Sequence, residues 1–385
     1  MNCGQFRVLL LLVFIVGLAT VQQSVAQINL DEEPRGVQYS LLPLIGYESD
    51  MGLVGGGYLE RIDYGDGVRP FLNTTSVEIT VSTKGHLISV LDHERLNTFG
   101  TDLRSRLRVE GIRIHTAPWF GIGNETTFSR SAYDDNFYFY EDRRFRFEYW
   151  GRKLLTEFGE KGQLDAHLIA LASYTRPVER SSSTLFAQNE IPGAEGGWVN
   201  QAGVGLILDS RSSEFDPVSG VRAEANIRFA GRLTASHYHF TTWLADVRHF
   251  FSPINNVVVA QRIELRHATG DTPFWELPVL GNEMALRGYV NNRFRGESSI
   301  VHNAEIRSWL FSLLDDQVKL GAQLFVDSGR VFAGDDRLSD LPGGLKHTIG
   351  VGGAFSILNP DFIFRGDLAF SEDIYRIYLG IGYSF

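Results

Sequence analysis

The chain has 385 residues, a formal net charge of −10 at pH 7 and a single cysteine. This acidic balance argues against nucleic acid as a partner, because binding to phosphates needs a basic surface. Beyond the N-terminal region no segment reaches eighteen apolar residues, so no transmembrane helix is expected there. The 40 glycines, 27 phenylalanines and 14 tyrosines, against only 12 prolines, favour β structure.

The N-terminus predicts export. Arg7 precedes the apolar run VLLLLVFIVGLATV, and the small residues of SVA offer a cleavage site after Ala26. Residues 1–26 are therefore predicted to be a secretory signal, with an uncleaved membrane anchor as the alternative. Cys3 would be removed with the signal. The remaining 385 − 26 = 359 residues contain no cysteine, so no disulfide is expected.

Most of the remaining chain alternates apolar and polar residues with a period of two over about ten residues. In NVVVAQRIELRHA, for example, Val259, Ile263 and Leu265 oppose Arg262, Glu264 and Arg266. A soluble β-sandwich and a transmembrane β-barrel both produce such strands. The strand length, the arginines and glutamates mixed on one face and the aromatic residues on the other favour the barrel.

Seventeen segments have strand character, but 118–128 alternates poorly and is rich in turn-forming residues, so it is predicted to be a loop. Sixteen strands remain, an even number as expected for a single-chain bacterial barrel. The sequence therefore predicts an all-β fold, a transmembrane antiparallel β-barrel over residues 37–385. A short periplasmic segment, 27–36, would precede it.

The last predicted strand, YRIYLGIGYSF, ends at the final residue and is expected to close the barrel. Its pattern resembles the C-terminal signal by which bacterial outer-membrane barrels are recognised for insertion, with Gly380, Tyr383 and Phe385 as the residues concerned. Alternation places one set of apolar side chains on the lipid-facing side: Tyr375, Ile377, Leu379, Ile381, Tyr383 and Phe385.

A long connection, 268–297, follows the eleventh predicted strand and falls outside the cell if both chain ends are periplasmic. It contains LRGYVNNRFRG, with Arg287, Arg293 and Arg295, and is far longer than a hairpin needs. Strand parity places Asp327 on the lumen side of a later strand. An inward carboxylate beside a long arginine-bearing loop suggests a charge-assisted pair. Parity places further residues inward: Asn303, Glu305, Arg307, Phe325 and Gly329.

Five short motifs in this order resemble those of the outer-membrane insertase and two-partner-secretion transporter superfamily (BamA-like and TamA-like barrels), also called bacterial surface antigens. The resemblance covers 209–385 and is only general over 37–200. The motifs are Asp209-Ser-Arg211, Pro217-x-x-Gly220, Arg287-Gly288-Tyr289, Asn303-x-Glu305-x-Arg307 and Phe325-x-Asp327-x-Gly329.

The resemblance implies a sixth outer loop that folds into the lumen. Arg287 would pair with Asp327, with Glu305 nearby, and Tyr289 would pack beside Phe325. Together with Gly288 and Gly329, these residues form the predicted lumen lock. The motif from Asp209 and Arg211 to Pro217 and Gly220 would form a periplasmic turn.

The resemblance also implies a function: insertion or translocation of protein, or of lipid, at the outer membrane of a Gram-negative-type bacterium. Outer-membrane lipid, the barrel-assembly machinery during biogenesis and a periplasmic or outer-membrane protein are the partners it implies. Family members that insert or export proteins carry POTRA domains before the barrel, and the ten residues 27–36 are too few for one. The alternative is a plugged or passive pore.

No catalytic site, cofactor or metal is expected, and the chain is not predicted to be an enzyme. The histidines are scattered and no G-x-S-x-G motif occurs. His302 falls on the lipid-facing side of its strand. One acidic stretch could supply oxygen ligands for calcium but lacks EF-hand spacing. Its residues are Asp134, Asp135, Glu141 and Asp142.

Overall fold

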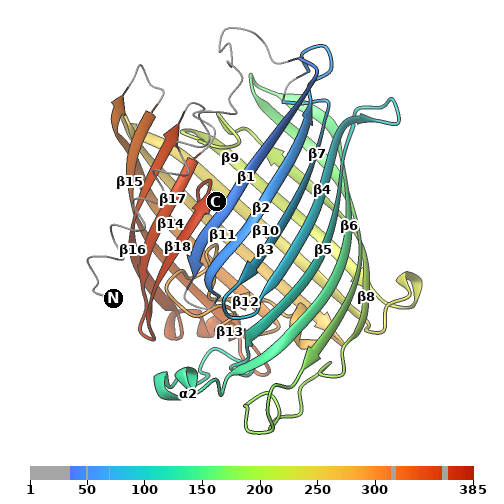
Figure 1. Ribbon diagram of the computed structural model, residues 1–385, viewed down its shortest axis with the longest axis vertical. Coiled ribbons are helices and arrows are strands. Elements are labelled where there is room, and N and C mark those ends of the chain that lie inside the picture. The colour runs from blue at the N-terminus through green and yellow to red at the C-terminus, as the bar shows by residue number, and fades with distance from the viewer. Residues whose placement is uncertain (1–34, 49–50, 69, 314–317, 358–362) are drawn as a thin grey trace.

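The computed structural model describes residues 35–48, 51–68, 70–313, 318–357 and 363–385. The predicted signal, Cys3 and most of the segment 27–36 lie outside these residues. The described chain forms one sixteen-stranded antiparallel sheet that curves into a barrel (Figure 1). Its strands are β1 (Val37–Glu48), β2 (Gly52–Asp63), β3 (Asn73–Ser82), β4 (Leu87–Thr98), β5 (Leu103–Pro118), β6 (Phe139–Phe158), β7 (Gly162–Val178), β8 (Gly197–Asp209), β9 (Gly220–Ala230), β10 (Phe240–Ile254), β11 (Val257–Gly270), β14 (Ser298–Leu313), β15 (Val318–Phe332), β16 (Lys346–Ile357), β17 (Ile363–Phe370) and β18 (Tyr375–Ile381).

Each strand of the sheet pairs with the strand that precedes it, and β11 pairs with β14 across the long loop. The predictions of an all-β barrel and of sixteen strands are confirmed. Residues 119–128 contain no strand, as predicted, although β5 runs on to Pro118. Among the described residues, no helix is long and apolar enough to cross a membrane.

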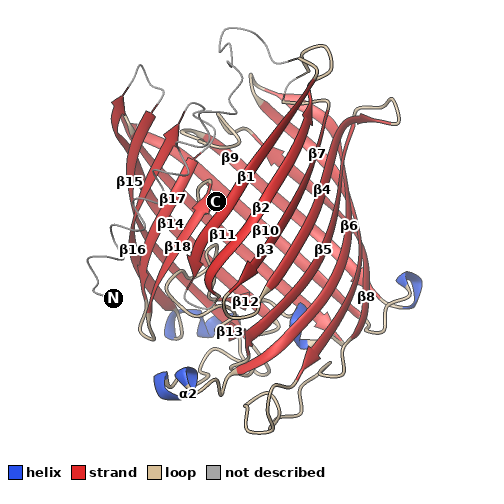
Figure 2. Ribbon diagram, viewed as in Figure 1, coloured by secondary structure: helices blue, strands red, loops and turns tan. Residues whose placement is uncertain are grey.

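The longer connections gather at the lower end of the barrel in Figures 1 and 2, where the few short helices also lie. We call this the outer end, because it is opposite the end at which β1 begins and β18 finishes. The connections there are 119–138, 179–196, 271–297 and 333–345. The elements within these and the shorter β9–β10 loop are α2 (Arg130–Asp134), η1 (Arg232–Thr234), η2 (Phe274–Glu276), β12 (Val279–Leu280), β13 (Phe294–Arg295) and η3 (Leu338–Gly343).

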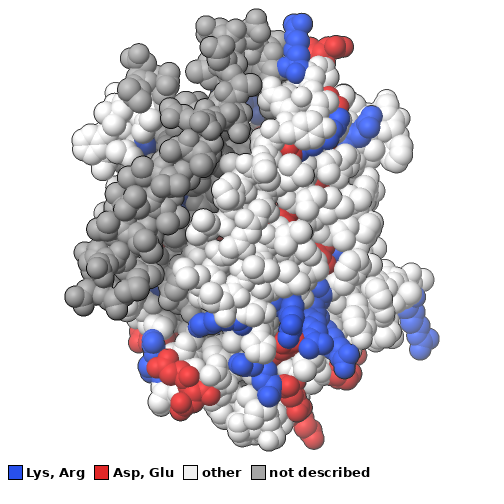
Figure 3. Space-filling view, in the orientation of Figure 1, with Lys and Arg blue, Asp and Glu red and all other residues white. Residues whose placement is uncertain are grey.

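The two faces of the wall differ as the alternation predicted. On β15, Leu324 and Val326 are 58% and 45% exposed on the outside, whereas Phe325 and Asp327 between them are buried on the lumen side. Figure 3 shows a broad uncharged band across the middle of one side of the barrel, with charged residues above and below it. Such a band matches the hydrocarbon layer of a bilayer.

The end of the chain corrects one prediction. Ile377 and Ile381 face outward as expected, but β18 stops at Ile381 and Gly382 has φ +78°. This left-handed conformation breaks the alternation. Phe385 is therefore buried on the lumen side, so its predicted lipid-facing position is wrong.

Contacts within the lumen hold the chain end in its inward position. Phe385 packs against Phe250, and the Arg307 guanidinium donates to the Phe385 carbonyl at 3.1 Å. Arg307 also lies over the Tyr383 ring, 4.0 Å from its centroid. The predicted lipid-facing position of Tyr383 is therefore also wrong, because the turn at Gly382 carries it inward.

The first and last strands are the edges of the sheet. β1 and β18 contact each other, but no hydrogen-bonded pairing joins them within the described residues. β18 has 7 residues against the 12 of β1, so it can cover only part of that edge. We call the β1–β18 junction the seam.

Candidate functional site in the barrel lumen

The connection between β11 and β14 lies against the inner wall. Its β12 and β13 pair as a two-stranded hairpin sheet. Leu286, Arg287, Tyr289 and Val290 are at most 1% exposed. A loop of this length stays ordered by burying its own side chains, and here it buries them against inward-facing residues of the later strands.

Arg287 makes the densest set of polar contacts in this loop. Its Nε and one terminal nitrogen donate to the two carboxylate oxygens of Asp327, both at 2.8 Å, and its backbone N–H donates to the same carboxylate at 3.1 Å. The other terminal nitrogen lies 2.6 Å from Glu305. All three side chains are 0% exposed. The fork of the guanidinium and the planar carboxylate match each other in shape, which makes this kind of pair strong and specific in direction.

A third carboxylate completes the charge environment. Asp367 of β17 lies 3.6 Å from Arg287 and also accepts from Gln323. Burial alone would lower the pKa of Arg287, but the hydrogen bond to Asp327 and the charges of Glu305, Asp327 and Asp367 together raise it above its usual value. Arg287 therefore stays charged.

An aromatic ring packs against the arginine of the Arg287–Asp327 pair. The Arg287 guanidinium lies over the Phe325 ring at 3.5 Å from its centroid, a close cation–π contact. Phe325 has space because its neighbour on β16 is Gly350, where an added Cβ would come within 2.1 Å of the ring. Glycine at this position thus allows the ring to lie flat beneath the arginine.

Gly288 positions the loop against β17 and β18, whereas Tyr289 packs within the loop itself. Gly288 has φ +103°, and its N–H donates to the Tyr378 hydroxyl at 3.0 Å. Tyr289 is buried, but it packs edge-on against Phe294 with ring centroids 5.0 Å apart. The expectation that Tyr289 lies beside Phe325 is wrong, since Phe325 instead packs with Ala369 and Tyr378.

The remaining predicted lock residue, Gly329, lies under the loop. A Cβ there would meet the Ile300 carbonyl oxygen at 2.9 Å and the side chains of Leu280 and Leu286 at 3.1 and 3.4 Å. The structure therefore brings Arg287, Glu305, Asp327 and Phe325 into direct contact, with Gly288, Tyr289 and Gly329 shaping the loop around them.

The other two arginines of LRGYVNNRFRG are also buried, nearer the outer end. Arg293 bonds Asp373 at 2.6 Å and the hydroxyl of Thr126 at 2.6 Å. Arg295 donates to the Phe274 carbonyl and lies over the Trp119 ring. All three arginines thus have partners within the same chain.

Three contacts link the tip of the loop to the part of the lumen farther from the outer end. Arg262 of β11 donates to the Met284 carbonyl at 2.8 Å. The Ser384 hydroxyl donates to the Glu283 carbonyl at 2.7 Å. Glu283 also lies 3.5 Å from Arg365 of β17, beside Gly380. The loop therefore spans much of the lumen and contacts the inward-turned chain end.

The predicted periplasmic turn motif forms the β8–β9 connection. Asp209 accepts from the Arg211 guanidinium at 2.7 and 3.0 Å and from its backbone N–H at 3.1 Å. Pro217 is buried, and Gly220 has φ +104° with the Ser210 carbonyl only 2.2 Å from any added Cβ. These residues shape the turn itself and are remote in the fold from the lumen lock.

Asp367, Tyr378 and Glu283 belong to the site but were not assigned to it from the sequence. Asp367 and Arg365 are buried at alternate positions of β17, so the period-two alternation of that segment was the signal available in the sequence. Its proximity to Arg287 depends on the pairing of β17 with β16 and β18, where Gly352 and Tyr378 are its cross-strand neighbours.

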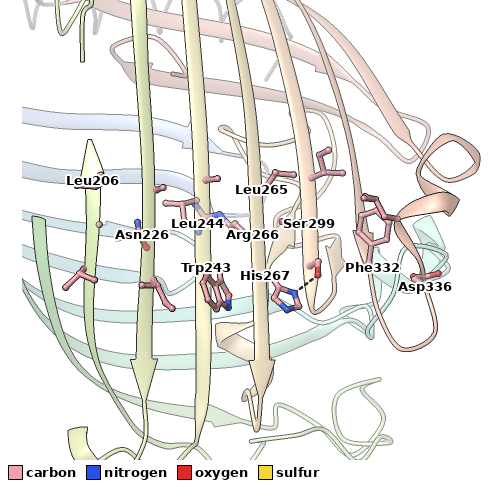
Figure 4. A pocket seen from close by; sticks show the side chains of 18 residues that line it. Leu206, Asn226, Trp243, Leu244, Leu265, Arg266, His267, Ser299, Phe332 and Asp336 are labelled. Carbon is pink, nitrogen blue, oxygen red and sulfur yellow. Dashed lines mark hydrogen bonds between the residues drawn. The ribbon is translucent and has the colours of Figure 1, made fainter. Parts of the chain in front are cut away.

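No group of three or more potential metal ligands occurs among the described residues. Glu141 and Asp142, two of the four acidic residues considered for calcium, face opposite sides of β6 and bond different arginines. A groove of about 730 Å³ lies elsewhere, on the outer wall beside the 333–345 loop (Figure 4). There Trp243, Leu265 and the hydrogen-bonded pair His267 and Ser298 contribute to its lining.

Comparison with known proteins agrees with this architecture. Residues 123–385 match the Omp85 superfamily domain, so the chain belongs to the Omp85 superfamily. Such proteins are outer-membrane barrels of the insertase and transporter type. No curated protein matches the chain.

Solved structures with a similar fold include BamA from Haemophilus ducreyi lacking POTRA domains 1–3, with a TM-score of 0.57 and 12% identity over 90% of this chain and 70% of that one. CdiB from Escherichia coli has a TM-score of 0.61 and 10% identity over 90% and 63%. CdiB from Acinetobacter baumannii has a TM-score of 0.57 and 9% identity over 90% and 60%. The chain thus spans less than two thirds of either CdiB.

Proposed function

We propose that this barrel inserts or translocates polypeptides at the outer membrane, and that the seam between β1 and β18 is where it engages them. Membership of the Omp85 superfamily supports the general class. A protein cargo, and a periplasmic or outer-membrane protein that delivers it, belong to the proposal.

The seam is the observation that carries this proposal. β1 has 12 residues and pairs with β2 along one edge. Within the described part of the chain, no strand pairs with its other edge, which faces β18. Unpaired backbone N–H and C=O groups at a sheet edge bind an incoming strand by adding it to the sheet. Inside a bilayer such groups are costly to leave unpaired, which favours pairing with a polypeptide that arrives there.

The lumen lock contacts the strands on one side of the seam, β17 and β18. Asp367 and Tyr378 of β17 and β18 contact the loop that carries Arg287 and Gly288. The last two strands are therefore held from inside by the loop. Opening of the seam would then leave β17 and β18 in place.

A photo-crosslinking residue tests the proposal. We expect Leu41→benzoylphenylalanine, at a side chain of β1 that is 74% exposed, to capture a barrel or secreted polypeptide in cells. The matched control is Val204→benzoylphenylalanine on β8, an outward side chain that is 53% exposed and far from the seam. Polypeptide adducts at Leu41 and none at Val204 would support the proposal. Equal capture at both positions, or lipid adducts alone, would contradict it and favour a passive plugged barrel.

A further inference from the structure

Three arginines form a row on the outer wall near the outer end of the barrel. Arg113 of β5 is directly opposite Arg143 of β6, which is directly opposite Arg176 of β7. All three side chains are exposed. Because directly opposed residues of an antiparallel pair lie about 5 Å apart, the row concentrates three positive charges within about 10 Å.

An aromatic row lies next to these arginines on the membrane side. Two residues further along each strand on the same face are Gly111, Phe145 and Tyr174, and Tyr174 is opposite Trp198 of β8. The Tyr174 and Trp198 rings lie 5.3 Å apart. Aromatic rows of this kind mark the boundary between hydrocarbon and headgroups in transmembrane barrels.

The spacing on β6 places the row at the level of the outer headgroups. Arg143 and Lys153 both face outward, opposite Arg113 and Leu103, and the outward positions between them carry no charge. Ten residues of strand span about 33 Å, or about 25 Å across the membrane at the usual tilt of about 40°, which matches the apolar band of such barrels. Figure 3 shows Lys and Arg residues gathered below the uncharged band of the barrel.

The protein supplies fewer carboxylates beside this row than are needed to neutralise its three arginines. Glu141 bonds both Arg143, at 2.5 Å, and Arg113, at 3.0 Å, and it also contacts His115 at 2.7 Å. Arg176 forms no ion pair in the part of the chain that the structure describes, unlike Arg113 and Arg143. Like charges directly opposite one another destabilise a strand pair, so an external anion would relieve the repulsion.

We propose that Arg113, Arg143 and Arg176 form a binding site for the phosphate groups of lipids in the outer leaflet. Guanidinium groups bind phosphate oxygens in bidentate fashion, and the width of the row suits a headgroup with one or two phosphates. The adjacent Phe145 and Tyr174 would contact the start of the acyl chains. This combination selects a lipid phosphate over a free phosphate ion.

Native mass spectrometry of the full-chain protein in detergent tests the site, with diphosphorylated lipid A, its dephosphorylated form and phosphatidylglycerol as probes. We expect lipid A to bind more tightly than the dephosphorylated form. We expect Arg113→Gln, Arg143→Gln and Arg176→Gln together to weaken lipid A binding by up to about 100-fold, roughly fivefold for each arginine. Tight binding of phosphatidylglycerol as well would identify the lipid phosphate in general as the ligand.

The matched control removes three exposed arginines from other outer loops, Arg130→Gln, Arg232→Gln and Arg337→Gln, with the same change in net charge. This control should bind lipid A as the unmodified protein does. Equal weakening of lipid A binding in both triple variants would show that net charge alone causes the effect, and would overturn the proposed site. Equal binding of dephosphorylated lipid A, or displacement of lipid A by millimolar inorganic phosphate, would also overturn it.

Discussion

The lumen lock and the outer-wall row place arginines in opposite physical situations. Arg287 is fully buried and contacts Asp327 and Glu305, with a third carboxylate nearby. Arg113 and Arg143 are exposed and share the single carboxylate of Glu141. A buried charge persists only where the chain itself supplies its partners, whereas a charge at the membrane surface can take its partner from the lipid. The difference suggests that the first group holds the fold together and the second meets the bilayer.

Loss of Arg287 should have the largest effect on stability. Arg287→Gln leaves Asp327 buried without its cation and leaves Glu305 paired with Arg307 alone, and we expect a loss of about 3–5 kcal/mol in the free energy of unfolding. Urea unfolding of the purified barrel, followed by its heat-dependent shift in gel mobility, measures this. Arg266→Gln is the control, since that side chain is 49% exposed and its pair with Glu264 should contribute at most about 1 kcal/mol. Equal losses in the two variants would contradict the assigned role of burial.

A smaller effect is expected from Gly288→Ala. The residue has φ +103°, and an added Cβ would lie 3.0 Å from the backbone of Phe370. We expect a loss of about 1–3 kcal/mol from backbone strain together with this close approach, measured by the same unfolding assay. Gly334→Ala in the 333–345 loop is the control, because φ there is +60° and nothing lies within 4 Å. If Gly334→Ala cost as much, the close approach of the loop to β17 would not be what requires glycine at 288.

The outer row should show the smallest effect and the opposite sign. In detergent without phosphorylated lipid, Arg176→Gln removes a like-charge contact with Arg143, so stability should stay unchanged or rise by about 0.2–1 kcal/mol. Thermal unfolding in a zwitterionic detergent measures this change. Addition of lipid A should reverse the order and make the unmodified protein the more stable one. A clear loss of stability in lipid-free detergent would show that Arg176 has a structural partner.

Much of the architecture could be predicted from local pattern. A strand alternates its side chains strictly, so the inward positions of Asp327, Glu305 and Phe325 were readable before any contact was known. At the end of the chain, alternation no longer predicts which face a side chain takes. Gly382 adopts a left-handed conformation, after which alternation no longer assigns Tyr383 and Phe385 to a face.

Contacts between separate segments of the chain were harder to predict from the sequence. Tyr289 was expected beside Phe325 but packs on Phe294, because its neighbours depend on how β12 and β13 fold within the loop. Asp367 joins Arg287 only through the register of β17. A shift of one residue in register would turn every side chain of that strand to the other face.

The sequence by itself determined the number of strands, the two faces of most of them and the loop in which the key arginine lies, because these follow from periodicity within single segments. Only the tertiary structure decided which carboxylates reach Arg287, that the chain end turns inward and that three arginines from separate strands align on the outer wall. It also decided that β1 and β18 are not paired with each other within the described residues. These depend on register and closure, which join residues far apart in the chain.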